Sequence, residues 1–253
     1  MIFQWVDHPT LKQTEQLLNL IYDLGMVQIR HLQAVTGWSY QKTKKQIYLF
    51  RKDLKKRGED ETKWLRTVHQ KKWNDQIVYY LGPRAMYHVN QMRQQHMGTT
   101  RGLSPYQQSH YMGINNILLE AIEFFGREKL EWYTEFELAD LLTLQLGNVE
   151  RSKILRPDAK IRIENEHEYF VEYDNATVGP RKLEQKFMRY IDFTSSTGYR
   201  TPVLWVTVTE QRKQYLERNW RASVSNFDGD VVPDSHFFVA GEELSLYQKL
   251  RTF

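Results

Sequence analysis

Three amphipathic helical segments, each ended by a glycine, occupy most of the first 58 residues. Apolar residues recur at helical spacing in 11–25, 27–37 and 39–58. Ser39 is suited to cap the N-terminus of the third segment, and Gly37 is suited to end the second. Short helices in close succession, the last two joined by a turn at Gly37, predict a helix-turn-helix.

Two strands are expected after the third helix. Residues 63–69 and 76–81 are rich in β-branched and aromatic residues, and they flank a polar turn that contains Asn74 and Asp75. A hairpin that follows three helices is the winged-helix arrangement. We therefore expect residues 1–97 to form a winged-helix domain.

A segment rich in Gly, Ser, Thr and Pro separates this domain from the rest of the chain. The stretch "HMGTTRGLSPYQQ" has few apolar residues, which is typical of a linker. We expect the linker at 98–108 and a second domain at 109–253. At 253 residues, the chain is long enough for two domains that each bury a core.

Basic residues are concentrated in the first domain. The chain has a net charge of +4, but residues 1–104 carry +9 and the remainder carries −5. Because the neutralisation of phosphates requires clustered Lys and Arg, the first domain is expected to bind double-stranded DNA. The expected contact residues are Ser39, Tyr40, Lys42, Thr43, Lys44, Lys45, Arg51 and Lys52 on the third helix, with Lys71 and Lys72 near the tip of the wing.

Composition limits the chemistry that the chain can carry. There is no Cys, which excludes disulfides, thiolate zinc sites and a cysteine nucleophile. Any bound metal would be held by carboxylates, His or carbonyl oxygens. No apolar run approaches the roughly 20 residues that span a bilayer, and the start does not resemble a signal peptide. We expect a cytoplasmic protein without a membrane partner.

A succession of helices and strands is expected in the second domain. The apolar strand "TPVLWVTVTE" is expected inside a sheet rather than at its edge. The expected elements are a helix at 109–126, a strand at 130–136 with a short helical turn after it, a hairpin within 159–175, a helix at 180–193, a strand at 201–210, a helix at 211–220, and a final strand and helix within 235–250.

Carboxylates stand at the ends of the two strands of the expected hairpin, in "RPDAKIRIENEHEYFVEYDNAT" (156–177). The hairpin brings Asp158, at the start of its first strand, towards Glu172 and Asp174 at the end of its second strand. Residues two apart on a strand point to the same face. Three carboxylates that converge in this way are suited to hold Mg²⁺ or Mn²⁺.

The same acids also have a purely structural interpretation. Each is then solvated at a strand end, or pairs on the surface with Arg156, Arg162 or Lys186, and such pairs contribute little to stability. Glu120, on the preceding helix, is either a fourth metal ligand or an ordinary surface residue.

This order of elements resembles the core of the PD-(D/E)XK, or restriction-endonuclease-like, superfamily. Pro157-Asp158 matches its first half-motif, Glu172 its second acid, and Lys186 with Tyr190 the Lys-x-x-x-Tyr element of some branches. Together with an N-terminal winged helix, "LRPDA", "VEYDNAT" and "KLEQKFMRY" are similar to the replication-relaxation family of plasmid and other mobile-element proteins. The resemblance implies a fold of the α+β/α/β class: an N-terminal winged helix-turn-helix followed by a restriction-endonuclease-like mixed-sheet α/β domain.

One position departs from the nuclease motif. The residue two after Glu172, normally Lys, is Asp174, which cannot supply a positive charge. The resemblance therefore implies a catalytic set of Asp158, Glu172, Asp174 and Lys186, in which Lys186 reaches in from the following helix. The other candidate donors are Lys182 and Lys160.

Three functions remain open. The first is a double-stranded DNA-binding accessory or regulatory protein of plasmid or mobile-element replication and relaxation, with the nuclease-like domain as a scaffold. The second is a Mg²⁺- or Mn²⁺-dependent DNA endonuclease or nickase that uses Asp158, Glu172, Asp174 and Lys186. The third is a protein-interaction module in which the winged helix binds another protein. The expected partners are double-stranded DNA, a second copy of the chain, and other replication or relaxation proteins.

Overall fold

The chain divides into two compact units in the computed structural model, which describes all residues except 7, 71–75, 94–102, 147–153, 230 and 251–253. The first unit is Ile2–Leu119, and the second unit is Glu120–Phe253 together with Met1. The division falls inside the helix α5 (Gln108–Phe125). The predicted domain limits stay a prediction, and residues 98–102 of the expected linker lie outside the described residues.

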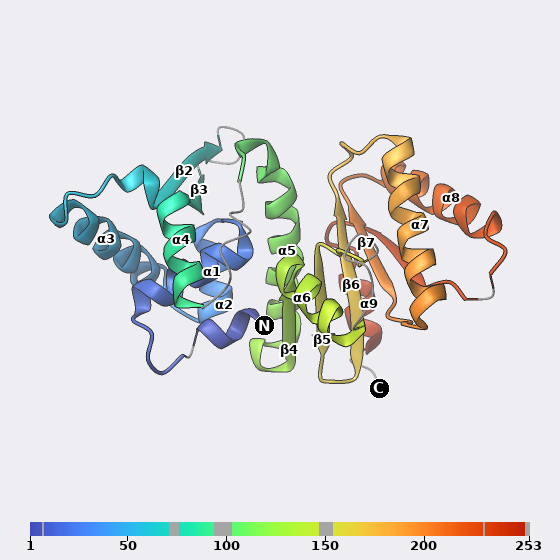
Figure 1. Cartoon of the computed structure of the whole chain (residues 1–253), viewed down its shortest axis with the longest axis horizontal. Coiled ribbons are helices and arrows are strands. Elements are labelled where there is room, and N and C mark those ends of the chain that lie inside the picture. Colours follow the sequence, from blue (N-terminus) through green and yellow to red (C-terminus); the bar gives the residue numbers. More distant parts are fainter. Residues whose placement is uncertain (7, 71–75, 94–102, 147–153, 230, 251–253) are drawn as a thin grey trace. The chain divides into compact units, whose positions relative to one another are not determined.

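Helices dominate the first unit, and a small sheet completes it (Figure 1). Its elements before α5 are η1 (Ile2–Trp5), α1 (Gln13–Leu24), β1 (Met26–Val27), α2 (Ile29–Thr36), α3 (Tyr40–Lys56), η2 (Glu61–Lys63), β2 (Leu65–Gln70), β3 (Gln76–Leu81), α4 (Pro83–Met92) and η3 (Pro105–Gln107). The predictions of three helices followed by a hairpin are therefore confirmed.

The sheet of the first unit is antiparallel and has the order β1-β3-β2. Strand β1 was not predicted, because two residues are too short to show an alternating pattern; Met26 pairs with Tyr80. Gly25, just before β1, has a φ of 73°, and a Cβ there would lie 2.9 Å from the ring of Tyr111. Both the backbone conformation and the close approach of the ring therefore require glycine at this position.

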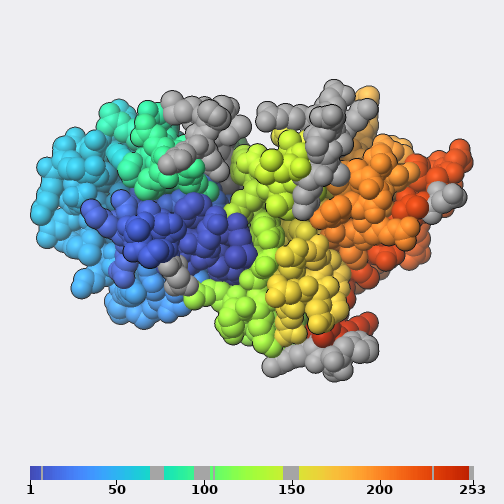
Figure 2. Space-filling model, turned by 60° about the horizontal axis from the view of Figure 1, so that its bottom comes forward, coloured from blue at the N-terminus to red at the C-terminus, as the bar shows by residue number. Residues whose placement is uncertain are grey.

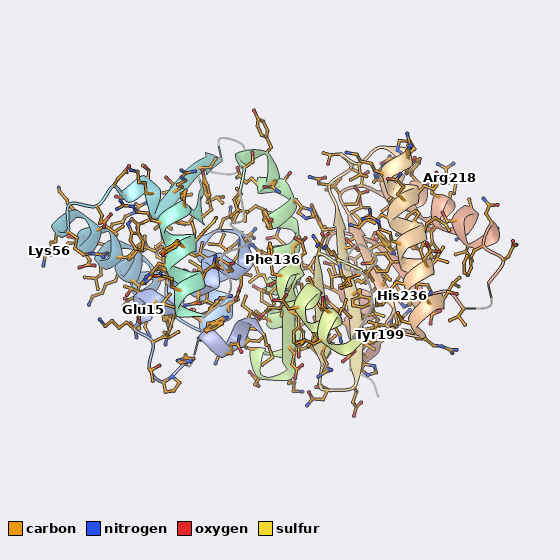
Figure 3. All side chains as sticks on the ribbon, viewed as in Figure 1. Glu15, Lys56, Phe136, Tyr199, Arg218 and His236 are labelled. Carbon is orange, nitrogen blue, oxygen red and sulfur yellow. The ribbon has the colours of Figure 1, made fainter. Side chains whose placement is uncertain are left out.

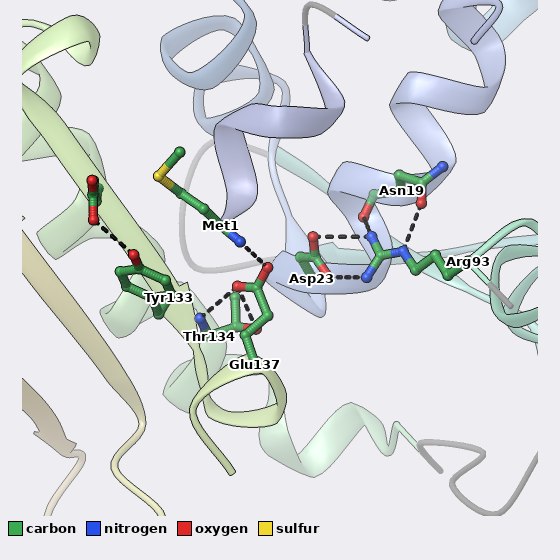
Figure 4. Close-up of polar contacts among 8 residues, drawn as sticks. Met1, Asn19, Asp23, Arg93, Tyr133, Thr134 and Glu137 are labelled. Atoms are coloured by element: carbon green, nitrogen blue, oxygen red, sulfur yellow. Dashed lines mark hydrogen bonds and ion pairs between the residues drawn. The ribbon is translucent and has the colours of Figure 1, made fainter. Parts of the chain in front are cut away.

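A buried ion pair joins α4 to α1 in the first unit (Figure 4). The guanidinium group of Arg93 donates to both carboxylate oxygens of Asp23, at 2.6 and 3.0 Å, and to Asn19 Oδ1 at 2.7 Å. The same group lies 4.2 Å from the ring centroid of Trp5 and 4.7 Å from that of Tyr22. Hydrogen bonds, an ion pair and two aromatic rings of the first unit thus hold Arg93.

The second unit contains a five-stranded sheet with helices packed on it. Its elements after α5 are η4 (Arg127–Lys129), β4 (Leu130–Thr134), α6 (Glu135–Leu146), β5 (Ala159–Ile163), β6 (His167–Asp174), α7 (Pro180–Thr197), β7 (Val203–Thr207), α8 (Glu210–Ser225), β8 (Ser235–Val239) and α9 (Leu244–Leu250). The predicted helices and strands are confirmed, except that α6 is a twelve-residue helix where a short turn was expected.

The sheet has the order β4-β5-β6-β7-β8 and is mixed. Strand β5 is antiparallel to both of its neighbours, β4 and β6, whereas β6, β7 and β8 run parallel to one another. Helices α7 and α8 cover one face (Figure 1). The core on that face includes Phe170 and Trp205 from the sheet, Phe187 and Tyr190 from α7, and Leu216 from α8. Strand β7 lies inside the sheet, as predicted from its apolar sequence.

Helices α5 and α9 pack together through the rings of Phe125 and Tyr247, whose centroids are 5.3 Å apart. The carboxyl groups of Glu120, on α5, and Glu243, just before α9, lie close to each other there, and Glu243 is buried. Burial and the nearby Glu120 carboxyl raise the pKa of Glu243 to about 8. Two neighbouring carboxyl groups therefore lie where α9 packs against α5.

Strand β8 is the last strand of the sheet order, and a glutamate caps part of its open edge. The backbone N–H of Val239 donates to Glu242 Oε2 at 3.0 Å, and Lys213 of α8 donates to the same oxygen at 2.9 Å. The backbone of Ala240 bonds instead to Thr207 of β7. Because alternate residues of a strand direct their backbone groups to the same side, Val239 faces away from β7.

Candidate functional site

The helix α3 has one buried face, which determines the side chains that it presents to solvent. Ser39 caps its N-terminus by accepting a hydrogen bond from the backbone N–H of Lys42 at 3.2 Å. Thr43, Ile47 and Leu54 are buried at helical spacing, and α3 packs against α1 and α2. The opposite face is therefore free of contacts with these two helices.

The exposed side of α3 carries aromatic and basic side chains. Tyr40, Lys44, Lys45, Tyr48 and Lys52 are all exposed. The ammonium group of Lys44 lies 5.2 Å from the ring centroid of Tyr40, one helical turn away. The space-filling view shows this part of the chain, in light blue, at the surface of the first unit (Figure 2). We call these five residues the α3 stripe.

Three residues predicted to contact DNA have other roles in the structure. Thr43 is fully buried and donates from its hydroxyl to the Ser39 carbonyl at 3.1 Å, and its role as a DNA contact stays a prediction. It lies one turn before Ile47, on the packed face of α3. Arg51 is half-buried and pairs with Glu61 at 2.7 Å, and Ser39 is engaged in capping. Arg51 and Ser39 can contact DNA only through those of their atoms that remain exposed to solvent.

The remaining predicted contact residues lie at the surface or outside the described residues. Lys42 is half-buried, and its ammonium group lies 4.7 Å from the ring centroid of Trp38. Lys71 and Lys72, at the expected wing tip, lie outside the described residues. Sequence reasoning missed Tyr48, whose side chain is 61% exposed. A projection of the helix would have found it, since Tyr48 follows the exposed Lys44 by four residues and lies outside the buried side formed by Thr43, Ile47 and Leu54.

The β5–β6 hairpin brings two of the three predicted carboxylates together. Asp158 directly precedes β5, and its Oδ2 accepts a hydrogen bond from the backbone N–H of Tyr173 at 2.8 Å. Glu172, beside it on β6, is buried. Lys186 from α7 forms an ion pair with Glu172 Oε2, and its ammonium group is 4.0 Å from Asp158 Oδ2. The Tyr190 hydroxyl donates to Glu172 Oε1 at 2.5 Å.

The third carboxylate, Asp174, is bound to an arginine instead. Arg212, on α8, donates from Nε to Asp174 Oδ2 at 2.5 Å and from Nη2 to the Val178 carbonyl at 2.9 Å. The backbone N–H of Ala176 donates to Asp174 Oδ1 at 3.1 Å. In the part of the chain that the structure describes, no group of three or more His, Cys, Asp or Glu side chains could hold a metal ion. The role of these residues as metal ligands stays a prediction.

The other basic and acidic candidates lie elsewhere in the second unit. Lys160 is buried and pairs with Glu168 at 2.7 Å, so it is not available to Asp158. Lys182 is exposed on α7. Glu120 is half-buried and lies beside Glu243, and its role as a fourth ligand stays a prediction. Arg212 was not predicted, because no spacing in the sequence indicates that α8 reaches the end of β6.

We call the group formed by Asp158, Glu172, Asp174, Lys186, Tyr190 and Arg212 the carboxylate site. Burial and charge determine which of its members are protonated. Burial, together with the neighbouring Asp158 carboxylate, raises the pKa of Glu172 well above its ordinary value. Burial alone would lower the pKa of Lys186, but the carboxylates of Asp158 and Glu172 outweigh it and raise that pKa. Lys186 therefore carries its charge beside Glu172.

A sequence profile described as replication-relaxation matches residues 18–208. The chain belongs to the replication-relaxation family. Membership of this family indicates a role in the replication or relaxation of plasmids or other mobile elements. The matched residues include the α3 stripe and the carboxylate site up to Lys186 and Tyr190, whereas Arg212 lies beyond them.

No curated protein sequence and no solved structure gave a significant match to the chain. Among the described helices, none combines the length and the apolar character that crossing a membrane requires.

Proposed function

We propose that this member of the replication-relaxation family is a double-stranded DNA-binding accessory protein of plasmid or mobile-element replication or relaxation. On this proposal the first unit is a winged helix-turn-helix in which α3 is the recognition helix and the β2–β3 hairpin is the wing. The second unit is a restriction-endonuclease-like α/β domain that serves as a scaffold or a surface for partners. The partners that this role implies are double-stranded DNA, a second copy of the chain, and other replication or relaxation proteins.

The observation that carries the proposal is the composition of the α3 stripe. Lys44, Lys45 and Lys52 are exposed along a 17-residue helix, with Tyr40 one turn before the first lysine and Tyr48 between Lys45 and Lys52. A helix fits into the major groove of DNA, where lysines neutralise phosphates and release bound counterions. Tyrosine can contact the sugar or a base edge at the same time. A face selected only for solubility would not need two large exposed rings among its lysines.

Charge reversal of two adjacent lysines tests the proposal. The variant carries Lys44→Glu and Lys45→Glu, and its affinity for a fluorescent duplex is measured by anisotropy at several salt concentrations. Wild-type affinity should fall steeply with salt. The double variant should bind roughly tenfold more weakly or worse, and the slope of log affinity against log salt should fall by about 2, since each lost phosphate contact contributes about 0.9.

A matched control separates a local effect from the effect of net charge. Arg218→Glu with Arg221→Glu produces the same change in net charge on the exposed surface of α8, where Arg218 projects from the helix (Figure 3). This control should retain wild-type affinity. Equal losses in both variants would show that only the total charge matters, and salt-independent binding or no binding by the wild-type chain would overturn the proposal.

A further inference from the structure

Basic side chains of the protein already pair with the carboxylates of the carboxylate site in the second unit. Both oxygens of Glu172 have protein donors, which are the ammonium group of Lys186 and the hydroxyl of Tyr190. Both oxygens of Asp174 are also engaged, one by Arg212 and one by a backbone N–H. Two basic side chains from two different helices therefore neutralise carboxylates at the same end of β6.

A divalent cation requires a different arrangement of the same groups. Mg²⁺ takes about six oxygen ligands in near-octahedral geometry, and the carboxylate oxygens must point to one common position. In this site Asp174 is turned to Arg212, while Asp158 and Glu172 share Lys186. An ammonium group within ion-pair distance of the remaining two carboxylates repels a second cation.

Lys186 lies between the Glu172 carboxyl group and solvent. Its side chain is 34% exposed, whereas that of Glu172 behind it is only 1% exposed. The Lys186 ammonium group also lies 5.8 Å from the ring centroid of Trp205, which pairs with Glu172 across β6 and β7. A metal ion that entered from solvent would therefore meet the charge of Lys186 before it met the Glu172 carboxylate.

We propose that Lys186 and Arg212 are the resident cations of this site and take the place of a divalent metal. The Mg²⁺ or Mn²⁺ expected from the superfamily resemblance does not fit the ligands as they are arranged. The site instead joins the end of β6 to α7 through Lys186 and Tyr190, and to α8 through Arg212. This inference does not rest on DNA binding by α3.

Manganese uptake by the intact chain tests this proposal, with Mn²⁺ alone as the probe. Calorimetry and the room-temperature electron paramagnetic resonance signal of free Mn²⁺ should detect no uptake by the wild-type protein. Removal of the two charges by Lys186→Gln with Arg212→Gln should produce uptake of one Mn²⁺ per chain. Adding Asp158→Asn to that variant should abolish the uptake.

Controls on the same two helices remove a charge without opening the site. Lys182→Gln is one turn from Lys186 on α7, and Lys213→Gln is next to Arg212 on α8. Neither substitution should produce uptake of Mn²⁺. If Lys186→Gln with Arg212→Gln folds poorly, each substitution is tested alone, and Mn²⁺ should raise the Tm of a single variant while it leaves the wild-type Tm unchanged.

Each alternative outcome counts against the proposal. Stoichiometric uptake of Mn²⁺ by the wild-type chain, lost in Asp158→Asn, would show that the lysine and the arginine do not exclude metal. Failure of every folded variant to take up Mn²⁺ would show that the two cations are not what excludes it. Conversion of supercoiled plasmid by wild-type protein with Mg²⁺ or Mn²⁺, lost in Asp158→Asn, would support the endonuclease alternative instead.

Discussion

The hydroxyl of Tyr190 donates a hydrogen bond to Glu172 Oε1 over 2.5 Å, and both side chains are buried. The bond joins α7 to β6. Tyr190 follows Lys186 by four residues on α7, and Lys186 forms an ion pair with the same carboxyl group. The Lys-x-x-x-Tyr spacing therefore places two donors on one carboxyl from a single helix face. In this chain the spacing serves to hold α7 against the sheet.

Removal of the Tyr190 hydroxyl should destabilise the second unit. In Tyr190→Phe the ring remains, but one buried oxygen of Glu172 loses its donor. The free energy of unfolding in urea should fall by about 1–3 kcal/mol, the usual effect of leaving a buried polar group unsatisfied. The control Tyr106→Phe, at a side chain that is 95% exposed, should change the stability by less than about 0.5 kcal/mol. Equal stability of Tyr190→Phe and wild type would contradict this role.

The ion pair between Asp23 and Arg93 should be essential to the first unit. Asp23→Ala leaves a buried guanidinium group without its carboxylate, which typically destabilises a protein by about 3–5 kcal/mol. The comparison is Asp53→Ala, which removes the same charge from an exposed pair with Arg57 and should cost less than about 1 kcal/mol. Chemical denaturation of both variants measures the difference. If both variants lost the same free energy of unfolding, burial of the pair between Asp23 and Arg93 would not increase its contribution to stability.

Stability should fall as pH rises, through Glu243. Its pKa is about 8 in the folded chain and near the ordinary 4.5 when unfolded, so the folded state binds more protons between these two values. The free energy of unfolding should therefore decline from pH 5 to pH 8, by an amount on the order of 1–4 kcal/mol, and the loss from this group should end within about one pH unit above its folded pKa.

Two substitutions at neighbouring positions check that assignment. Glu243→Gln keeps the side chain neutral and should reduce the decline of Tm between pH 5 and pH 8. Glu242 is exposed, and its pKa is lowered mainly by the hydrogen bond from Lys213, so Glu242→Gln should leave the decline in place. A decline that is unchanged in Glu243→Gln would assign it to other groups, of which Glu172 is the first candidate.

On the proposed function, Tyr48 should contribute to DNA affinity. Tyr48→Ala removes a ring that is 61% exposed and should weaken duplex binding roughly three- to tenfold, which corresponds to about 1 kcal/mol. The Tm should not change. Tyr106→Ala, another exposed tyrosine of the same unit, should bind DNA like the wild type. Titration by fluorescence anisotropy gives both affinities, and equal affinities would exclude Tyr48 from the interface.

Helix and strand positions were predictable because they depend on local patterns. Apolar spacing and glycine stops located α1, α2 and α3, and the alternation in β5 and β6 located the hairpin that brings Asp158 to Glu172. Predictions of this kind need only neighbouring elements and their periods. The approach of Lys186 to the carboxylates was implied by the superfamily resemblance, with Lys182 and Lys160 as the alternatives.

Contacts that depend on sheet order could not be predicted. Arg212 reaches Asp174 only because β7 lies parallel to β6 and delivers α8 to the same end of the sheet. The sequence alone does not specify which strands pair, and the charge of Asp174 suggested a metal equally well. The burial of Thr43 was not anticipated, because the basic run was interpreted as a whole, without separation of the two faces of α3.

The carboxylate of Glu242 has a consequence for the behaviour of the protein at high concentration. An exposed strand at the end of a sheet is a template on which another chain can add a strand. At β8 the outward N–H of Val239 is already occupied by Glu242, and Lys213 holds that carboxylate in place. Loss of the Glu242 carboxylate should therefore favour fibre-like self-association through this edge.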